Sequence, residues 1–274
     1  MRIKVRHETT YTYAAPARGA LQMIRLTPRS CENQFVRTWR VEIDADSRLE
    51  KSEDAYGNRM HMVSIEGPIE RVVVTIEGEV DTTDCGGFVR GTLERQPEGL
   101  FLRDTSLTQP SPAIRAFARN ARAAEGGDML AALHRINAEI HTSLRFDTDA
   151  THAATRAADA FEGGHGVCQD FAQVFIAAAR SLGVPARYVS GYYLRTDRTD
   201  QEAGHAWAEA HLKGLGWIGF DPAQGHCVTD RYIRVAIGAD ANEAAPLRGA
   251  QVGGAGEALQ VAIDVTRGRD IVQQ

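Results

Sequence analysis

The chain has 274 residues, of which 43% are hydrophobic and 24% are charged, and its formal net charge at pH 7 is −5. This length fits one large domain or two modest ones, and the composition is typical of a globular protein in water. The slightly acidic balance argues against general nucleic-acid binding, which needs a concentrated basic surface. No apolar run reaches the ~18 residues that a membrane-spanning helix requires, so membrane insertion is not predicted.

Residues 1–7 alternate between charged and apolar side chains, which predicts a β-strand and not a secretory signal peptide. The four cysteines, Cys31, Cys85, Cys168 and Cys227, form no CxxC pair. Zinc-ribbon and disulfide frameworks are therefore not predicted. Together these features lead us to expect a cytoplasmic protein.

Residues 1–108 are predicted to be rich in β-structure. Residues 3–7 and 39–43 alternate at period two, and residues 72–76 are mostly β-branched. Clusters that contain Gly and Pro mark the turns between such segments. We expect several short antiparallel strands here, arranged as a sandwich-like domain. Because this half contains no cluster of catalytic residue types, its expected role is support or substrate access.

A second domain is expected over residues 113–274, after a linker of Pro, Ser and Gln at 109–112. Apolar residues recur at helical spacing over 128–144, and Asp128 is a suitable N-cap, so this segment is predicted to be a helix. A loop and a short helix at about 155–161 are expected to follow.

Later in the chain the pattern predicts one helix followed by antiparallel strands. The helix should span 168–182, because Gly183 ends it and Pro185 cannot continue it. The polar segment 195–203 is interpreted as a hairpin loop and the Gly- and Ala-rich segment 238–257 as a longer loop. Strands are expected at 187–193, 205–212, 217–221 and 258–265. The predicted fold class is α+β, with an N-terminal antiparallel β-sandwich followed by helices packed on an antiparallel sheet.

Cys168 follows a glycine-rich turn and begins the predicted helix. The positive end of a helix dipole stabilises a thiolate there, and the unpaired N–H groups of the first turn can stabilise an oxyanion. Gly163, Gly164 and Gly166 would let the chain turn tightly and let a substrate approach the backbone. We therefore assign substrate-binding roles to Gly166 and to His165, which is expected to line the cleft or face solvent.

His205 and Asp221 follow Cys168 in the chain, each at one end of a predicted strand. A thiol needs a base, and the base needs a group that fixes its tautomer and orientation. This order predicts Cys168 as the nucleophile, His205 as the base and proton donor, and Asp221 as the orienting carboxylate. Trp207 shares a strand face with His205, so we expect it to form a wall of the substrate site. No metal or cofactor is predicted, since a thiol oriented in this way needs neither.

Two carboxylates near these residues have simpler interpretations. Asp170 is expected to cap or pair in the first turn of the helix, where carboxylates are favoured. Glu209 shares a face with His205 and is expected to form a surface or structural ion pair and not to take part in catalysis.

These residues lie in segments that resemble the bacterial transglutaminase-like superfamily. Segments in the second half are 166–172, 183–192, 205–209 and 216–222, and segments similar to the family's N-terminal β region are 21–29 and 54–58. The resemblance implies a papain-like α+β core, with the nucleophile, base and orienting residue on Cys168, His205 and Asp221. It also implies an enzyme that handles amides, since the family includes transglutaminases and peptidases.

The chain departs from the animal transglutaminases that this family resembles. No tryptophan lies between residues 113 and 168 to supply their oxyanion donor, so the second donor is unassigned. No EF-hand-like loop is present, so calcium dependence is not predicted.

The functional prediction is a cysteine-dependent enzyme that cleaves a peptide or protein amide through a thioester. Hydrolysis by a peptidase or amidase is favoured over cross-linking, because water is always present and no feature that would recruit lysine is visible. The alternatives are a protein-glutamine amine transferase and a non-catalytic binding module that keeps the fold. The oligomeric state is left open.

Overall fold

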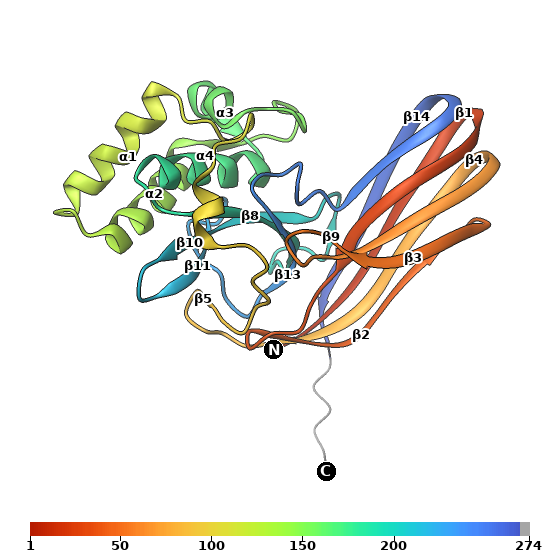
Figure 1. The fold of residues 1–274 in the computed structure, drawn as a ribbon, viewed down its shortest axis with the longest axis horizontal. Coiled ribbons are helices and arrows are strands. Elements are labelled where there is room, and N and C mark those ends of the chain that lie inside the picture. Colours follow the sequence, from red (N-terminus) through yellow and green to blue (C-terminus); the bar gives the residue numbers. More distant parts are fainter. Residues whose placement is uncertain (269–274) are drawn as a thin grey trace, which may run out of the picture.

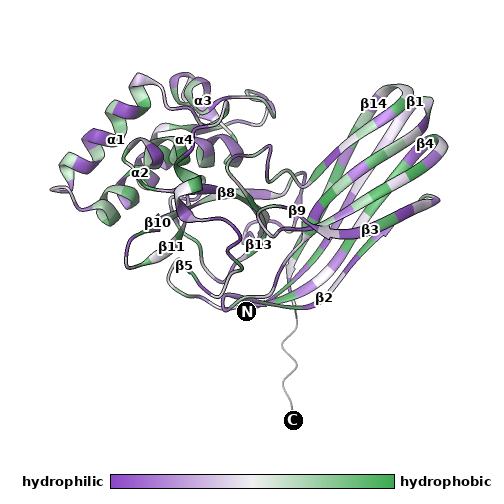
Figure 2. Cartoon of the chain, in the orientation of Figure 1, coloured by the Kyte–Doolittle hydropathy of each residue, from purple (hydrophilic) through white to green (hydrophobic). Residues whose placement is uncertain are grey.

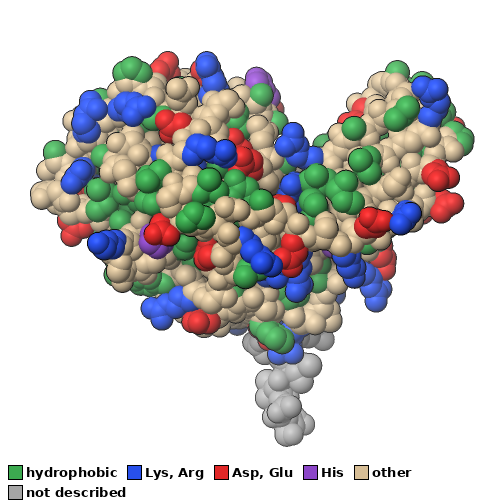
Figure 3. Space-filling model, viewed as in Figure 1, with side chains coloured by type: hydrophobic (Ala, Val, Ile, Leu, Met, Phe, Trp, Pro, Cys, Tyr) green, Lys and Arg blue, Asp and Glu red, His purple; other side chains and the backbone are tan. Residues whose placement is uncertain are grey.

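The computed structural model describes residues 1–268 of the chain. It has two parts, a core that carries the helices and a set of long strands that projects from one side of the core (Figure 1). In the space-filling view an open groove separates the projecting strands from the core (Figure 3). Across these described residues, no helix is both long enough and apolar enough to cross a membrane.

The projecting part is one antiparallel sheet. Its strands are β1 (Arg2–Thr27), β2 (Gln34–Ile43), β3 (Ser47–Glu53), β4 (Arg59–Thr82), β9 (Asp200–Gln201) and β14 (Leu247–Arg267). They are hydrogen-bonded in the order β2-β4-β1-β14-β9, and β3 pairs with the first half of β4. The expectation of short strands is wrong here, because β1 and β4 have 26 and 24 residues.

The three longest strands bend together at the far end of this sheet, which folds over into two layers (Figure 1). The register between β1 and β4 shifts between Thr12 and Gly19. β14 bends where Gly253, Gly254 and Gly256 take φ angles of 71°, 78° and 64°. Glycine adopts this conformation readily because it has no Cβ. The predicted sandwich is confirmed, and its two layers are made from the two halves of the same strands.

Alternation of apolar and polar side chains builds the inside of this sandwich, as the hydropathy along its strands shows (Figure 2). In β1, Ile3 and Val5 are fully buried, whereas Lys4 and Arg6 are exposed. Burial of each such aliphatic side chain contributes about 1.5–3 kcal/mol. The same buried cluster includes four residues of the core, which are Tyr192, Leu194, Ile233 and Val235. The two parts therefore share a common apolar interface.

The core contains a second antiparallel sheet. Its strands are β5 (Phe88–Val89), β8 (Ala186–Tyr193), β10 (His205–Leu212), β11 (Gly216–Asp221), β12 (His226–Cys227) and β13 (Tyr232–Gly238). They are arranged in the order β12-β11-β10-β8-β13, with β5 paired to β11. The helices are the short 3-10 helix η1 (Glu98–Leu102), α1 (Pro112–Ala124), α2 (Met129–Ser143), α3 (Ala157–Gly163) and α4 (Cys168–Ser181). This arrangement confirms the predicted α+β class.

Helix α4 lies at the centre of the core and contacts β8, β10 and the other three α-helices. Every residue from Asp170 to Arg180 is buried. A helix that is buried on all sides is stable only inside such a layered arrangement. Gly183, with φ 79°, follows its end, as predicted. The expected helix over 128–144 is confirmed as α2, which Asp128 caps by accepting a hydrogen bond from the N–H of Ala131.

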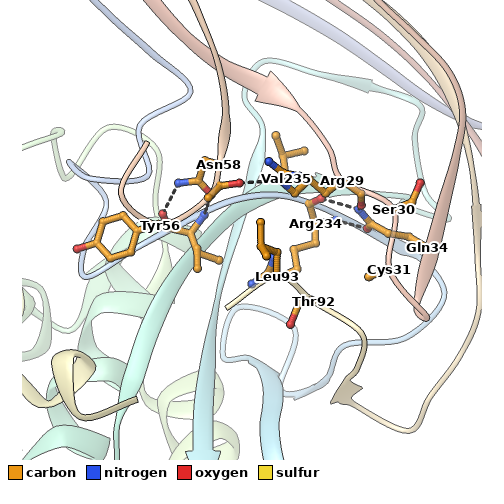
Figure 4. Close-up of a pocket in the computed structure, with 12 residues that line it drawn as sticks. Arg29, Ser30, Cys31, Gln34, Tyr56, Asn58, Thr92, Leu93, Arg234 and Val235 are labelled. Carbon is orange, nitrogen blue, oxygen red and sulfur yellow. Dashed lines mark hydrogen bonds between the residues drawn. The ribbon is translucent and has the colours of Figure 1, made fainter. Parts of the chain in front are cut away.

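A tight turn that begins at Asp54 fastens the sandwich to the core. The Asp54 carboxylate accepts hydrogen bonds from Nε of Arg25 and from the backbone N–H groups of Tyr56 and Asn58. The Asn58 side chain exchanges two hydrogen bonds with the backbone of Ile237 on β13, at 2.7 and 2.9 Å. Figure 4 shows Tyr56 and Asn58 on the wall of a small pocket of about 20 Å³ at this junction.

Two of the longer elements of the core, α1 and β13, are absent from the sequence-based prediction. Helix α1 begins at Pro112, and the Ser111 side chain caps it by accepting a hydrogen bond from the N–H of Ile114. Its buried face is formed by Ile114, Ala118 and Ala121. β13 is the second such element, and it is defined by pairing with β8.

The C-terminal prediction is wrong in two respects. The segment 238–257 is not a loop throughout, because β14 starts at Leu247 and pairs with β1 despite its many glycines. The strand expected at 258–265 exists as part of β14, but it lies in the sandwich and not in the core. Conversely, β5 lies within the first 108 residues of the chain, but it pairs with β11 in the core and not with the sandwich. The chain crosses between the two parts, and a domain boundary at 109–112 stays a prediction.

Candidate active site

Cys168 is the first residue of α4, as predicted, and its side chain is partly exposed. The preceding chain ends α3 at Gly164, with φ 70°, and then forms β7 (His165–Gly166), which pairs in parallel with β6 (Arg145–Phe146). These contacts fix where the helix begins. The sulfur therefore stands at the positive end of a buried helix, where a thiolate is stabilised.

Asp170 holds this end of the helix from within its first turn. Oδ2 of its carboxylate accepts hydrogen bonds from the Val167 backbone N–H at 2.9 Å and from the Thr151 hydroxyl at 2.7 Å. The side chain is 1% exposed, and burial raises its pKa. The predicted capping role is confirmed.

Gly166 and His165 have internal contacts that the sequence does not reveal. A Cβ on Gly166 would lie 2.7 Å from Oδ2 of Asp170, so the absent side chain makes room for the helix cap. This contact gives Gly166 a structural role, and its assignment to substrate binding stays a prediction. The ring of His165 lies against Gly163, and its Nδ1 has no hydrogen-bond partner within residues 1–268. Substrate contact by His165 stays a prediction.

His205 and Asp221 face each other from neighbouring strands. His205 begins β10, Asp221 ends β11, and Nε2 lies 2.6 Å from Oδ2. Asp221 is fully buried. Its other oxygen, Oδ1, accepts hydrogen bonds from the backbone N–H groups of Ala223 and Gln224 at 2.9 and 3.2 Å. The turn after β11 therefore fixes the carboxylate from the side opposite the imidazole.

Cys168 lies near enough to the imidazole of His205 to help raise the pKa of the ring. Since Nε2 faces Asp221, the other ring nitrogen, Nδ1, is left for the sulfur. Burial lowers the pKa of His205, but the charge and hydrogen bond of Asp221 and the contact with Cys168 outweigh burial and raise the pKa to about 10. The imidazole is therefore protonated at neutral pH, and an imidazolium favours the thiolate form of a neighbouring cysteine. The structure brings the three predicted side chains together.

Three aromatic rings surround His205. The ring centroids of Tyr193, Tyr232 and Trp207 lie 5.2, 5.9 and 6.3 Å from that of the imidazole. Trp207 stands on the same strand as His205, as predicted, but it is only 1% exposed. The expectation that it walls the substrate site is wrong, because its side chain is enclosed in a buried cluster that includes Tyr193 and Tyr232. Its place makes it a support for the imidazole.

Tyr232 is a residue of this site that the sequence analysis does not identify. Its hydroxyl donates a hydrogen bond of 2.7 Å to Oδ2 of Asp221, the same oxygen that His205 contacts. Tyr232 begins β13, which lies at the other edge of the sheet from β11 and β12. The two residues are 11 positions apart, but their strands are not neighbours in the sheet, so the spacing alone does not reveal the contact.

The segment before His205 connects the site to the sandwich. Within the predicted loop at 195–203, the short strand β9 pairs with β14. The backbone N–H of Val265 in β14 also donates to the carbonyl of Thr199 at 3.1 Å. The two parts of the molecule are therefore hydrogen-bonded to each other a few residues before His205.

Glu209 is confirmed as a structural residue. It is fully buried on β10 and forms ion pairs with Arg187 at 2.6 Å and with Arg234 at 2.7 Å. Burial raises the pKa of Glu209, but the two guanidinium groups outweigh it and lower the pKa to about 2. Arg187 in turn pairs with Glu94 and lies 3.8 Å from the Trp217 ring centroid. This network ties β8, β10 and β13 together behind the site.

A second contact between a cysteine and a histidine has different properties. Sγ of Cys227 lies 3.9 Å from Nδ1 of His134. Burial raises the pKa of Cys227 to about 11, which disfavours the thiolate. Within residues 1–268, no group of three or more His, Cys, Asp or Glu side chains is arranged to hold a metal ion.

Comparison with protein families covers both parts of the molecule. The profile of the transglutaminase-like superfamily matches residues 115–222, which include Cys168, His205 and Asp221. The profile of the bacterial transglutaminase-like N-terminal region matches residues 3–81, which lie in the sandwich. The chain belongs to the transglutaminase-like superfamily. The resemblance noted in the sequence is thereby confirmed.

Relatives match this superfamily member over most of its length. An uncharacterised protein of Mycobacterium leprae is 30% identical over 280 residues, which cover 97% of this chain and 99% of that protein. An uncharacterised protein of Mycobacterium tuberculosis is 28% identical over 274 residues, which cover 90% of this chain and 87% of that protein. A solved structure from Cytophaga hutchinsonii, described as a candidate cysteine protease, has a TM-score of 0.77 and 20% identity. That match covers 99% of this chain and 92% of the other and shows a common fold.

Proposed function

We propose that this protein is a thiol acyl-transfer enzyme that cleaves peptide or protein amides through a thioester on Cys168. The observation that supports this most directly is the arrangement around His205. One nitrogen of its imidazole is bound by the buried carboxylate of Asp221 at 2.6 Å, and Cys168, at the start of α4, lies near enough to the ring to help raise its pKa. This is the geometry that a nucleophile, its base and an orienting group require.

In the first half-reaction the Cys168 thiolate attacks the carbonyl carbon of the amide. A C–S bond forms, and the carbonyl oxygen becomes an oxyanion. The backbone N–H of Cys168 belongs to the first helical turn, where N–H groups have no partner within the helix, so it is suited to donate to that oxyanion. As the C–N bond breaks, the imidazolium of His205 gives its proton to the leaving amine.

In the second half-reaction neutral His205 takes a proton from the nucleophile that resolves the thioester. With water as nucleophile the C–S bond breaks and a carboxylic acid leaves, which regenerates the thiolate and imidazolium. With an amine as nucleophile the product is a new amide, as in a transglutaminase. We propose hydrolysis as the main outcome, because water always reaches a partly exposed sulfur.

Turnover of a set of peptide amides and activated peptide esters tests the proposal. The intact protein should release amine or alcohol from some of these probes, and Cys168→Ala should abolish that release. Cys227→Ala is the matched control, because it removes a partly buried thiol with a raised pKa, and it should retain turnover. Turnover that survives in Cys168→Ala would refute the proposal.

A second experiment identifies the nucleophile that takes the acyl group from the thioester. The reaction is run in water labelled with heavy oxygen and in the presence of a primary amine. Hydrolysis should place the heavy oxygen in the product acid, whether or not the amine is added. A product that consists mainly of the new amide would show that the protein is an amine transferase.

A further inference from the structure

Within residues 1–268, the carboxylate of Asp221 accepts hydrogen bonds from four groups. Two backbone N–H groups of the following turn bind Oδ1. Oδ2 is shared by Nε2 of His205 at 2.6 Å and by the hydroxyl of Tyr232 at 2.7 Å. Because the carboxylate is fully buried, these donors determine both its orientation and the distribution of its charge.

Tyr232 is held in place by the sheet and by other rings. It begins β13 and pairs directly with Tyr193 of β8. Its ring centroid lies 4.7 Å from that of Tyr193 and 5.3 Å from that of Trp207, and the residue is 5% exposed. The hydroxyl therefore reaches Asp221 from a rigid element and not from a mobile loop.

We infer that Tyr232 is a positioning residue of the candidate site, which holds the Asp221 carboxylate in the plane that His205 needs and shares the charge on Oδ2 with the imidazole. This inference rests on the proposed function of Cys168, His205 and Asp221. The hydroxyl acts through Asp221 and does not touch the substrate. When two donors bind the same oxygen, each interacts less strongly with its negative charge than a single donor would.

Burial and the charge and hydrogen bond of Asp221 raise the pKa of Tyr232 far above its ordinary value. The hydroxyl consequently keeps its proton and stays a donor throughout the pH range in which a protein is active. The other titratable or charged groups near this pair are Cys168, Tyr193, His205, His226 and Arg231. Of these, only His205 shares an Asp221 oxygen with Tyr232.

The test compares Tyr232→Phe with Tyr193→Phe in the full-length protein. Tyr193 is the matched control, because it is a buried tyrosine opposite Tyr232 and packs on His205, while no hydrogen bond within residues 1–268 joins it to Asp221. In Tyr232→Phe the imidazole should hold its proton to higher pH, so the alkaline limb of kcat/KM should move upward. The looser carboxylate should lower kcat by about tenfold, with little change in KM. Tyr193→Phe should leave the alkaline limb in place.

A second measurement does not depend on turnover. In a Cys168→Ala background, the proton NMR signal of the His205 ring N–H that faces Asp221 should shift in Tyr232→Phe and stay in Tyr193→Phe. Equal signals and equal pH profiles in the two variants would overturn the inference, as would a change confined to KM. If the signal shifts while Cys168→Ala still turns over substrate, the hydrogen-bond relation holds but the proposed function fails.

Discussion

Gly166 lies so close to Asp170 that a Cβ at position 166 would be 2.7 Å from the carboxylate oxygen Oδ2. That oxygen accepts the Val167 N–H at 2.9 Å and so fixes the point at which α4 begins. The place of the nucleophile therefore depends on the absence of one side chain two residues before it. The geometry of the helix start is by itself a sufficient reason for a glycine at this position.

We predict that Gly166→Ala disrupts the start of α4. The added methyl group must displace the Asp170 side chain, and overpacking of this kind costs about 1–3 kcal/mol of unfolding free energy. Urea denaturation measures that loss. Gly99→Ala is the matched control, because no atom lies within 4 Å of its Cβ position. A Gly166→Ala variant as stable as Gly99→Ala would contradict this account of the helix end.

Alkylation by iodoacetamide should distinguish Cys168 from the other thiols. Cys168 lies beside an imidazolium, whereas burial raises the pKa of Cys227 to about 11. At slightly acidic pH we expect Cys168 to be labelled first and Cys227 last, as measured by mass mapping of peptides. His205→Ala should slow the labelling of Cys168 and leave that of Cys227 unchanged. Equal rates for the two thiols in the unmodified protein would argue against an activated nucleophile.

The raised pKa of His205 predicts a pH dependence of stability. Its pKa goes from 6.5 in the unfolded chain to about 10 in the folded protein, because the favourable effects of Asp221 and Cys168 outweigh burial. The stabilisation is fully present below about pH 6.5 and is lost as the pH rises through about 10. Denaturation at several pH values should show a steeper alkaline loss for the unmodified protein than for His205→Gln. Identical slopes would mean that the imidazole does not hold its proton in the fold.

Glu209→Gln should destabilise the fold strongly, because it removes the buried negative charge that balances the guanidinium charges of Arg187 and Arg234. Breaking a buried ion pair costs about 3–5 kcal/mol. Glu50→Gln is the control, since it removes an exposed ion pair with Arg48 and should cost less than about 1 kcal/mol. Calorimetry of both variants compares the two losses. A similar small effect for both would show that the Glu209 network adds little to the stability.

The pKa of Glu209, lowered from 4.5 to about 2, also has a consequence at acid pH. Its contribution to stability is present above about pH 4.5 and is lost as the pH falls towards about 2. Glu209→Gln should therefore show a weaker acid loss of stability than the unmodified protein.

Much of the candidate site could be predicted because its signals are local. The glycines before Cys168 and Gly183 after the helix mark α4, and the strands that carry His205 and Asp221 are neighbours in the chain as well as in the sheet. A short turn connects those two strands, so their side chains meet without any long-range information.

The parts of the fold and of the site that could not be predicted depend on pairing between segments that are far apart in the sequence. The Gly-rich start of β14 has the composition of a loop, and it becomes a strand because it pairs with β1 at the other end of the chain. Tyr232 reaches Asp221 only because β13 pairs with β8, and Trp207 is covered because residues from other elements, Tyr232 among them, pack against its ring. Period-two alternation gives the face of a strand and does not show what covers that face.

The mass of the acyl-enzyme tests the central claim most directly. The intact protein is mixed briefly with an activated peptide ester, quenched in acid and analysed by mass spectrometry. We expect a gain of one acyl group that peptide mapping places on Cys168, and no such gain in Cys168→Ala. An adduct on another residue, or turnover without any acyl adduct, would contradict the thioester chemistry.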